Sequence, residues 1–171
     1  THRALDGGRA LNATWFGHPR GLATLFMTEM WERFTYYGMR GILILFLVDA
    51  VDSGGFGLDD RMAAAVYGLY TTATYLMALP GGWIADRLIG AQHAVFWGAV
   101  LMLAGNVLLA LPGGVVAFYA GCLLIVLGVG LLKPNISAMV AQLYPEGGAR
   151  RDAGFTLFYL GINVGALLGS L

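Results

Sequence analysis

The sequence predicts an all-α integral membrane protein, and three features of its composition support this. Of 171 residues, 58% are hydrophobic and 12% are charged, whereas a soluble domain carries about 25% charged residues. The mean hydropathy is +0.70, and the 26 glycines are typical of membrane helices, which use glycine more freely than soluble ones. The formal net charge is zero, so charge gives no indication of a nucleic-acid partner.

Five segments are apolar over the length that a membrane span requires, about 20 residues. We expect helices over about residues 22–48, 62–85, 95–111, 115–144 and 154–171. The polar residues 1–21 are expected to form a cytoplasmic segment and not a signal peptide, because the apolar run after them is too long for a signal sequence. The fifth segment is still apolar at Leu171, which is typical of a piece of a longer protein.

Short connections and basic residues predict the topology. Pro112, Gly113 and Gly114 form a tight turn between the third and fourth segments, as expected for antiparallel neighbours. With a cytoplasmic N-terminus, only Arg61 of the loop arginines lies outside, among four aspartates. Six lie inside, and this asymmetry follows the positive-inside rule: Arg3, Arg9, Arg20, Arg87, Arg150 and Arg151.

Ionisable residues inside the first segment are the main functional signal. Such groups cost a few kcal/mol each at membrane depth, so they normally face a cavity and pair with one another. On a helix, Arg33, Tyr36 and Arg40 each fall within roughly 40° of Glu29, with Glu32 about 60° to one side. A local Glu29–Arg33 pair that only stabilises the helix is the alternative, but the polar stripe extends over about three turns.

Lys133, the only lysine of the chain, lies inside the fourth segment. Pro134 follows it, and we expect a kink there because proline lacks a backbone N–H and disfavours helical geometry at the residue before it. A buried lysine beside a carboxylate forms a proton-sensitive pair. The alternative, that Lys133 extends to the membrane interface, conflicts with its distance along the sequence from either end of the segment.

The stretch Glu29–Gly38 reads E-M-W-E-R-F-T-Y-Y-G and resembles the E-x-x-E-R-F-x-Y-Y-G signature of proton-dependent oligopeptide transporters, a branch of the major facilitator superfamily. Residues 82–90 resemble the superfamily's loop between its second and third helices. Residues 130–161, with L-K-P-N-I-S and D-A-G-F, also resemble the family, and the resemblance covers about residues 18–171. Two departures are Ala91-Gln92-His93, where many members have basic residues, and the lack of a histidine in the second helix.

The resemblance implies a fold and a set of residue roles. The fold would be the first five helices of the six-helix N-terminal bundle of a major-facilitator transporter, with the second bundle of the same protein as a partner. Proton coupling would involve Glu29, Glu32, Arg33 and Lys133, and Arg40 would act in gating. Substrate would be bound by Arg33, Tyr36, Tyr37, Tyr75, Lys133 and Asn163, although each tyrosine and Asn163 has helix packing as an alternative role.

The function implied is proton-coupled import of di- and tripeptides by alternating access, in a multi-pass protein of the bacterial inner membrane. Protons are the coupling ion, and no cofactor is expected. A transporter of nitrate or another small anion and a peptide sensor that does not transport are the alternatives. No metal site is expected, because His2, His18 and His93 are not spaced as ligands. The sequence shows no pair of a nucleophile and a base, so an enzyme is not expected.

Overall fold

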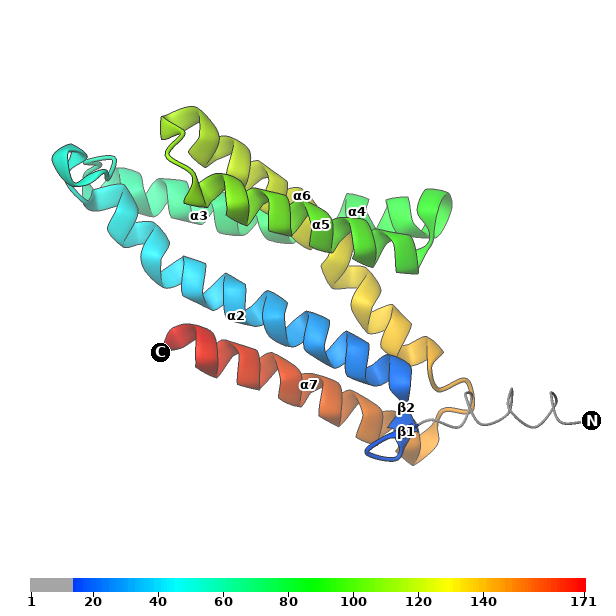
Figure 1. The fold of residues 1–171 in the computed structure, drawn as a ribbon. Coiled ribbons are helices and arrows are strands. Elements are labelled where there is room, and N and C mark those ends of the chain that lie inside the picture. Colours follow the sequence, from blue (N-terminus) through cyan, green and yellow to red (C-terminus); the bar gives the residue numbers. More distant parts are fainter. Residues whose placement is uncertain (1–13) are drawn as a thin grey trace, which may run out of the picture. The chain divides into compact units, whose positions relative to one another are not determined.

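The computed structural model describes residues 14–171, and most of these residues are helical (Figure 1). Helix α2 is followed by a single turn of 3-10 helix at Val51–Ser53, and α4 continues into a π-helical turn at Ala85–Ile89. The elements in chain order are β1 (Thr14–Trp15), β2 (His18–Pro19), α2 (Arg20–Val48), α3 (Asp60–Leu76), α4 (Ala78–Ile84), α5 (Ala91–Ala110), α6 (Gly114–Gln142) and α7 (Gly148–Ser170).

Four of the described helical segments are long and apolar enough to cross a membrane: 60–89, 91–110, 114–142 and 148–170. Helix α2 is long enough, at 29 residues, but carries charged residues along its length. The predicted all-α fold is confirmed, with one addition. Residues 14–19 form a small antiparallel hairpin that the sequence did not indicate, and residues 1–13 of the predicted N-terminal segment lie outside the described part.

The chain packs as two compact units. The first contains the part before Arg40 together with Val140–Leu171, and the second is Arg40–Met139. Helices α2 and α6 each contribute residues to both units. The predicted site residues are therefore divided between the two units.

In the first unit, α2 and α7 pack closely along a row of glycines, and Figure 1 shows the two helices side by side. A methyl group at Gly161 would lie 2.9 Å from the ring of Phe26, and one at Gly165 would lie 2.9 Å from the Arg33 Cβ. The four-residue spacing places these glycines on one face of α7. Small residues of this kind let two membrane helices approach closely.

In the second unit, α5 packs on α6 through two pairs of glycines, Gly98 with Gly128 and Gly105 with Gly121. A methyl group at Gly98 or at Gly105 would lie 2.7 Å from the carbonyl oxygen of its partner glycine. No larger residue fits either position without a shift of the backbone, so the spacing of α5 and α6 depends on glycine.

Pro134 lies inside α6, which nevertheless continues as one helix of 29 residues. Proline has no N–H to donate to the carbonyl of Gly130, one turn earlier. Gly81 of α4 lies directly against that carbonyl, where even a methyl group would clash. The Asn135 side chain donates to the Leu131 carbonyl at 2.7 Å, in the turn before Pro134. Helix α6 therefore does not break at Pro134, and α4 packs closely against the carbonyl that proline leaves without a helical donor.

The second and fifth apolar segments have different bounds from those expected. The expected 62–85 helix is interrupted at Met77, and Pro80 then lies in the first turn of α4, where a backbone N–H has no helical partner. Helix α7 begins at Gly148, six residues before the expected start at residue 154. Its first turn contains Arg150 and Arg151, so hydropathy alone did not indicate this part of the helix.

Candidate functional site

An arginine and two glutamates form a buried cluster on α2. The guanidinium of Arg33 donates through Nε and Nη2 to both carboxylate oxygens of Glu32. Its Nε also lies 3.6 Å from Glu29 Oε1, one turn earlier. Glu29 and Glu32 are each 3% exposed and Arg33 is 6% exposed. The structure thus brings the predicted coupling residues of α2 together, with the adjacent Glu32 as the closer partner of Arg33.

Two aromatic rings continue this cluster along α2. The guanidinium of Arg33 lies over the Tyr36 ring, 4.8 Å from its centroid. Tyr36 is buried and meets Tyr37 edge to face at 5.2 Å. Cation–π contact and two carboxylates together surround the cation with partial or full negative charge. The arginine is therefore held in one orientation by three side chains of its own helix.

Helix α7 supports the same cluster through its backbone. Gly165 lies against the Met30 carbonyl and the Arg33 Cβ, so no α7 side chain separates the two helices there. Asn163, one of the predicted substrate-binding residues, is exposed on α7. Its side-chain amide donates to the Tyr159 carbonyl at 3.0 Å. Asn163 thus presents an exposed polar group on the helix that packs on the Arg33 cluster.

In the second unit, Lys133 of α6 and Tyr75 of α3 come together. The Lys133 Nζ lies 5.4 Å from the centroid of the Tyr75 ring. Lys133 is half-buried, and Tyr75 is 61% exposed. A cation over an exposed aromatic ring gains about 0.5–1 kcal/mol from that contact. The predicted pairing of Lys133 with a glutamate of α2 would join the two units, and it stays a prediction.

The predicted gating residue, Arg40, also faces an aromatic ring. Its guanidinium lies 5.5 Å from the centroid of Tyr67 in α3. Arg40 is exposed, whereas the Tyr67 hydroxyl is buried and has no hydrogen-bond partner among the described residues. An unsatisfied buried hydroxyl is costly, so Tyr67 is a functional candidate that the sequence did not indicate.

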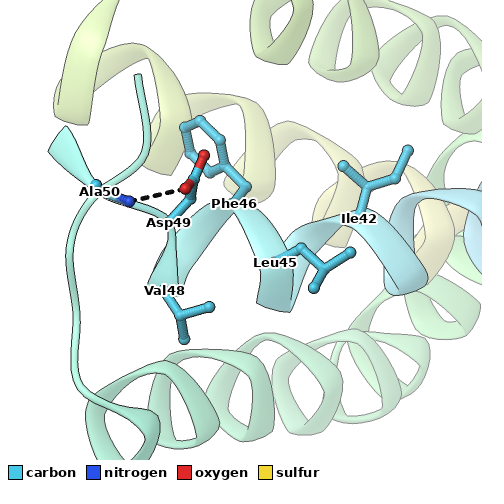
Figure 2. Close-up of a pocket in the computed structure, with 6 residues that line it drawn as sticks. All are labelled: Ile42, Leu45, Phe46, Val48, Asp49 and Ala50. Atoms are coloured by element: carbon cyan, nitrogen blue, oxygen red, sulfur yellow. Dashed lines mark hydrogen bonds between the residues drawn. The ribbon is translucent and has the colours of Figure 1, made fainter. Parts of the chain in front are cut away.

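A pocket at the end of α2 contains none of the predicted site residues (Figure 2). Its one charged side chain is Asp49, which accepts a hydrogen bond from the Ala50 backbone N–H at 2.9 Å. The remaining lining is mostly aliphatic and aromatic, so the pocket offers no set of groups for a polar substrate. It is lined by Ile42, Leu45, Phe46, Val48, Asp49 and Ala50.

A polar contact that the sequence did not indicate lies at the start of α2. His18 Nδ1 and the Tyr144 hydroxyl share a buried hydrogen bond of 2.7 Å, and the two residues are 126 positions apart. Burial raises the pKa of Tyr144, and the nearby Arg150 opposes this shift. The hydroxyl is therefore neutral at physiological pH. Among residues 14–171, no group of three or more histidine, cysteine or acidic side chains could hold a metal.

Comparison with known proteins identifies the family. The model of the POT family matches residues 92–171. A di-/tripeptide transporter of Lactococcus lactis subsp. cremoris is 49% identical over 160 residues, which cover 92% of this chain and 32% of the relative. An uncharacterized transporter of Bacillus subtilis is likewise 49% identical over 157 residues, with the same coverage of each chain. This chain belongs to the POT family.

A solved structure gives the same result for the fold. The crystal structure of a mutant of a POT peptide transporter in complex with alafosfalin is 52% identical, with a TM-score of 0.89. The match covers 93% of this chain and 33% of that one. The predicted fold, part of the N-terminal helical bundle of a major-facilitator transporter, is confirmed by this similarity. The chain spans about a third of the length of the curated relatives that it matches.

Proposed function

We propose that the protein containing this chain imports di- and tripeptides together with protons. Relatives named di-/tripeptide transporters support the substrate class. The observation that carries the proposal is the buried Arg33 cluster, in which two carboxylates share one guanidinium inside a helix of a membrane protein. Such groups are costly in a membrane and are retained for ion or substrate pathways.

The cluster suggests how a proton would be linked to substrate. With both glutamates ionised, Arg33 is paired with Glu32 and also lies near Glu29. Protonation of Glu32 would remove its charge and weaken its hold on the guanidinium, because a charge-assisted hydrogen bond is roughly twice as strong as a neutral one. Arg33 would then be available to a peptide carboxylate. Proton binding and peptide binding would thereby favour the same state.

Two further groups would complete the recognition of a zwitterionic peptide. Lys133, beside the exposed ring of Tyr75, would provide a second cation that binds the peptide carboxylate. Asn163 offers an exposed amide oxygen, which can accept a hydrogen bond from the peptide's ammonium group. The full-length protein would act in a cell membrane, inferred to be the bacterial inner membrane, with a cytoplasmic N-terminus. Its second bundle would form the opposite wall of the site.

Uptake of a labelled dipeptide by the full-length protein in liposomes tests the proposal. We expect accumulation with an inward proton gradient and none after a protonophore is added. Glu32→Gln should abolish accumulation, while exchange of peptide across the membrane without a gradient continues. Accumulation that is unaffected by the protonophore would contradict proton coupling. The 171-residue chain alone should not transport, because it spans about a third of the length of its relatives.

A further inference from the structure

The hairpin before α2 has an unusual turn. Trp15 pairs with His18, which leaves Phe16 and Gly17 as a two-residue loop. Both residues have positive φ, 49° and 80°, the pattern of a type I′ turn. Asparagine or glycine normally occupies the first of these positions, because a Cβ crowds the backbone there. Phenylalanine at this position is strained, and Phe16 is the only residue other than glycine with positive φ among residues 14–171.

The described residues make little contact with the Phe16 side chain. The side chain of Phe16 is 79% exposed and has an edge contact with Trp15, with ring centroids 5.0 Å apart. Trp15 itself is half-buried and packs on Phe26 of α2 at 5.2 Å. The turn therefore holds one phenyl ring outward on an aromatic base. A strained conformation of this kind points to a function outside the internal packing.

The hairpin is fixed to the rest of the first unit by two hydrogen bonds. The Arg150 Nη2 donates to the Gly17 carbonyl at 2.9 Å, which ties the tip to the first turn of α7. His18 is bound to Tyr144 just after α6 ends. The tip therefore lies where α2 and α7 begin and α6 ends. This is the level at which a membrane helix leaves the hydrocarbon core and meets the headgroups.

The charges around the hairpin favour an anionic partner slightly. Arg20, the first residue of α2, is exposed, as are Arg150 and Arg151. Two exposed carboxylates, Glu146 and Asp152, lie in the same part of the chain. Among the described residues, this region therefore carries three positive and two negative side chains. Basic side chains beside exposed aromatic rings are typical of surfaces that bind anionic lipid.

We propose that the hairpin tip is an interfacial anchor, in which Phe16 inserts between anionic phospholipids while Arg20 and Arg150 face their phosphates. Insertion would bury the exposed ring and thus explain why phenylalanine is placed in a turn that disfavours it. The hydrogen bonds to Tyr144 and Arg150 would link the position of the membrane surface to the ends of α6 and α7. The anchor is independent of the transported substrate.

The location of the ring can be measured directly in the full-length protein. Phe16→Cys, in a background without other cysteines, is labelled with a fluorophore and placed in nanodiscs of phosphatidylglycerol and phosphatidylcholine. We expect quenching by lipids that carry a nitroxide near the headgroup, and little quenching by aqueous iodide. Quenching by iodide alone would overturn the proposal. Protection from both quenchers would also overturn it, because another part of the protein would then cover the ring.

The anionic lipid is tested in nanodiscs of phosphatidylcholine alone. Quenching by the nitroxide lipid should fall when phosphatidylglycerol is absent. Equal quenching in both kinds of disc would overturn the assignment to an anionic headgroup.

A second variant separates the anchor from the fold of the hairpin. Asparagine suits a type I′ turn, so Phe16→Asn should leave the melting temperature in neutral detergent unchanged or higher. The further stabilisation on adding phosphatidylglycerol should fall to about half or less. Val51→Asn is the matched control, because Val51 is 70% exposed in the 3-10 turn after α2. If Phe16→Asn and Val51→Asn keep the same lipid-dependent stabilisation as the parent protein, the anchor does not exist.

Discussion

Gly165 of α7 is expected to set the position of Arg33, and Gly165→Ala tests this. A methyl group at Gly165 would lie 2.9 Å from the Arg33 Cβ and closer still to the Met30 carbonyl oxygen. Ordinary contact begins near 3.4 Å, so the contact with the Met30 carbonyl requires the two helices to separate by about 1 Å or more. Backbone cannot move aside as a side chain does. We expect a loss of about 1–3 kcal/mol in the free energy of unfolding, as for overpacked cores.

Gly165→Ala should lower the rate of transport by more than the loss of folded protein accounts for. A shift of Arg33 relative to the second bundle displaces the group that we propose to read both proton and peptide, and errors of about 1 Å in such positions cost up to about a hundredfold in rate. Gradient-driven uptake per folded molecule should therefore fall by about tenfold or more, and its pH dependence should shift. Both are measured in liposomes that contain equal amounts of correctly folded full-length protein.

Two glycines of the same α7 face provide matched controls. Gly161 faces the Phe26 ring and carbonyl, with the backbone contact, at 3.1 Å, longer than at Gly165, so Gly161→Ala should change both stability and uptake less. Gly169 faces the Phe34 backbone, so Gly169→Ala should destabilise the protein as much as Gly165→Ala but leave the pH dependence unchanged. If Gly165→Ala and Gly169→Ala lower uptake equally with identical pH profiles, Gly165 only packs the helices and does not position Arg33.

Two further predictions concern Lys133 and Tyr144. Lys133→Ala should weaken dipeptide binding by about tenfold to a hundredfold, since a hydrogen bond to a charged group is worth about 1.5–3 kcal/mol. The variant should also lose the preference for a dipeptide over its C-terminal amide. An unchanged preference would place Lys133 outside the substrate site. Tyr144→Phe removes the partner of the buried His18 and should lower the free energy of unfolding by about 1–3 kcal/mol in a detergent melt. Tyr159→Phe, at an exposed ring, is its control, and equal melting temperatures for the two variants would mean that the His18 contact contributes nothing.

The ion cluster of α2 was predictable from sequence because it is local. Helix geometry places Glu29 one turn from Arg33 whatever else the chain does, and this contact is present at 3.6 Å. The preference of Arg33 for Glu32 was not predictable, since residues at i and i+1 do not face each other on an ideal helix. That contact depends on the side-chain conformations that the buried surroundings impose.

Contacts between helices could not be predicted in the same way. The approach of Lys133 to Tyr75 depends on how α3 packs against α6, and no pattern in one sequence gives that. The bond between His18 and Tyr144 joins residues 126 positions apart. The hairpin turn was missed because Phe-Gly is not the usual signal of a type I′ turn. The sequence thus indicated which ionisable residues lie inside apolar segments, and the structure shows what they contact.

The Arg33 cluster also bears on how α2 enters the membrane. Along this helix, Glu29 and Glu32 carry two negative charges, and Arg33 and Arg40 carry two positive ones, so the interior of the helix is formally neutral. Pairing removes part of the cost of placing ions in lipid, whereas a buried charge left alone costs about 3–5 kcal/mol. The ion pairs proposed for coupling would therefore also make insertion of α2 possible.

This dual role predicts a specific pattern of rescue. Arg33→Gln leaves two buried carboxylates without their cation, so the amount of full-length protein inserted in the membrane should fall sharply. Adding Glu32→Gln removes one of these charges and should restore insertion, although uptake stays lost because both coupling groups are gone. Insertion is measured by protease protection and uptake in liposomes. Equal insertion of Arg33→Gln and the double variant would show that the cluster serves coupling alone, because removing a buried charge would then have brought no gain.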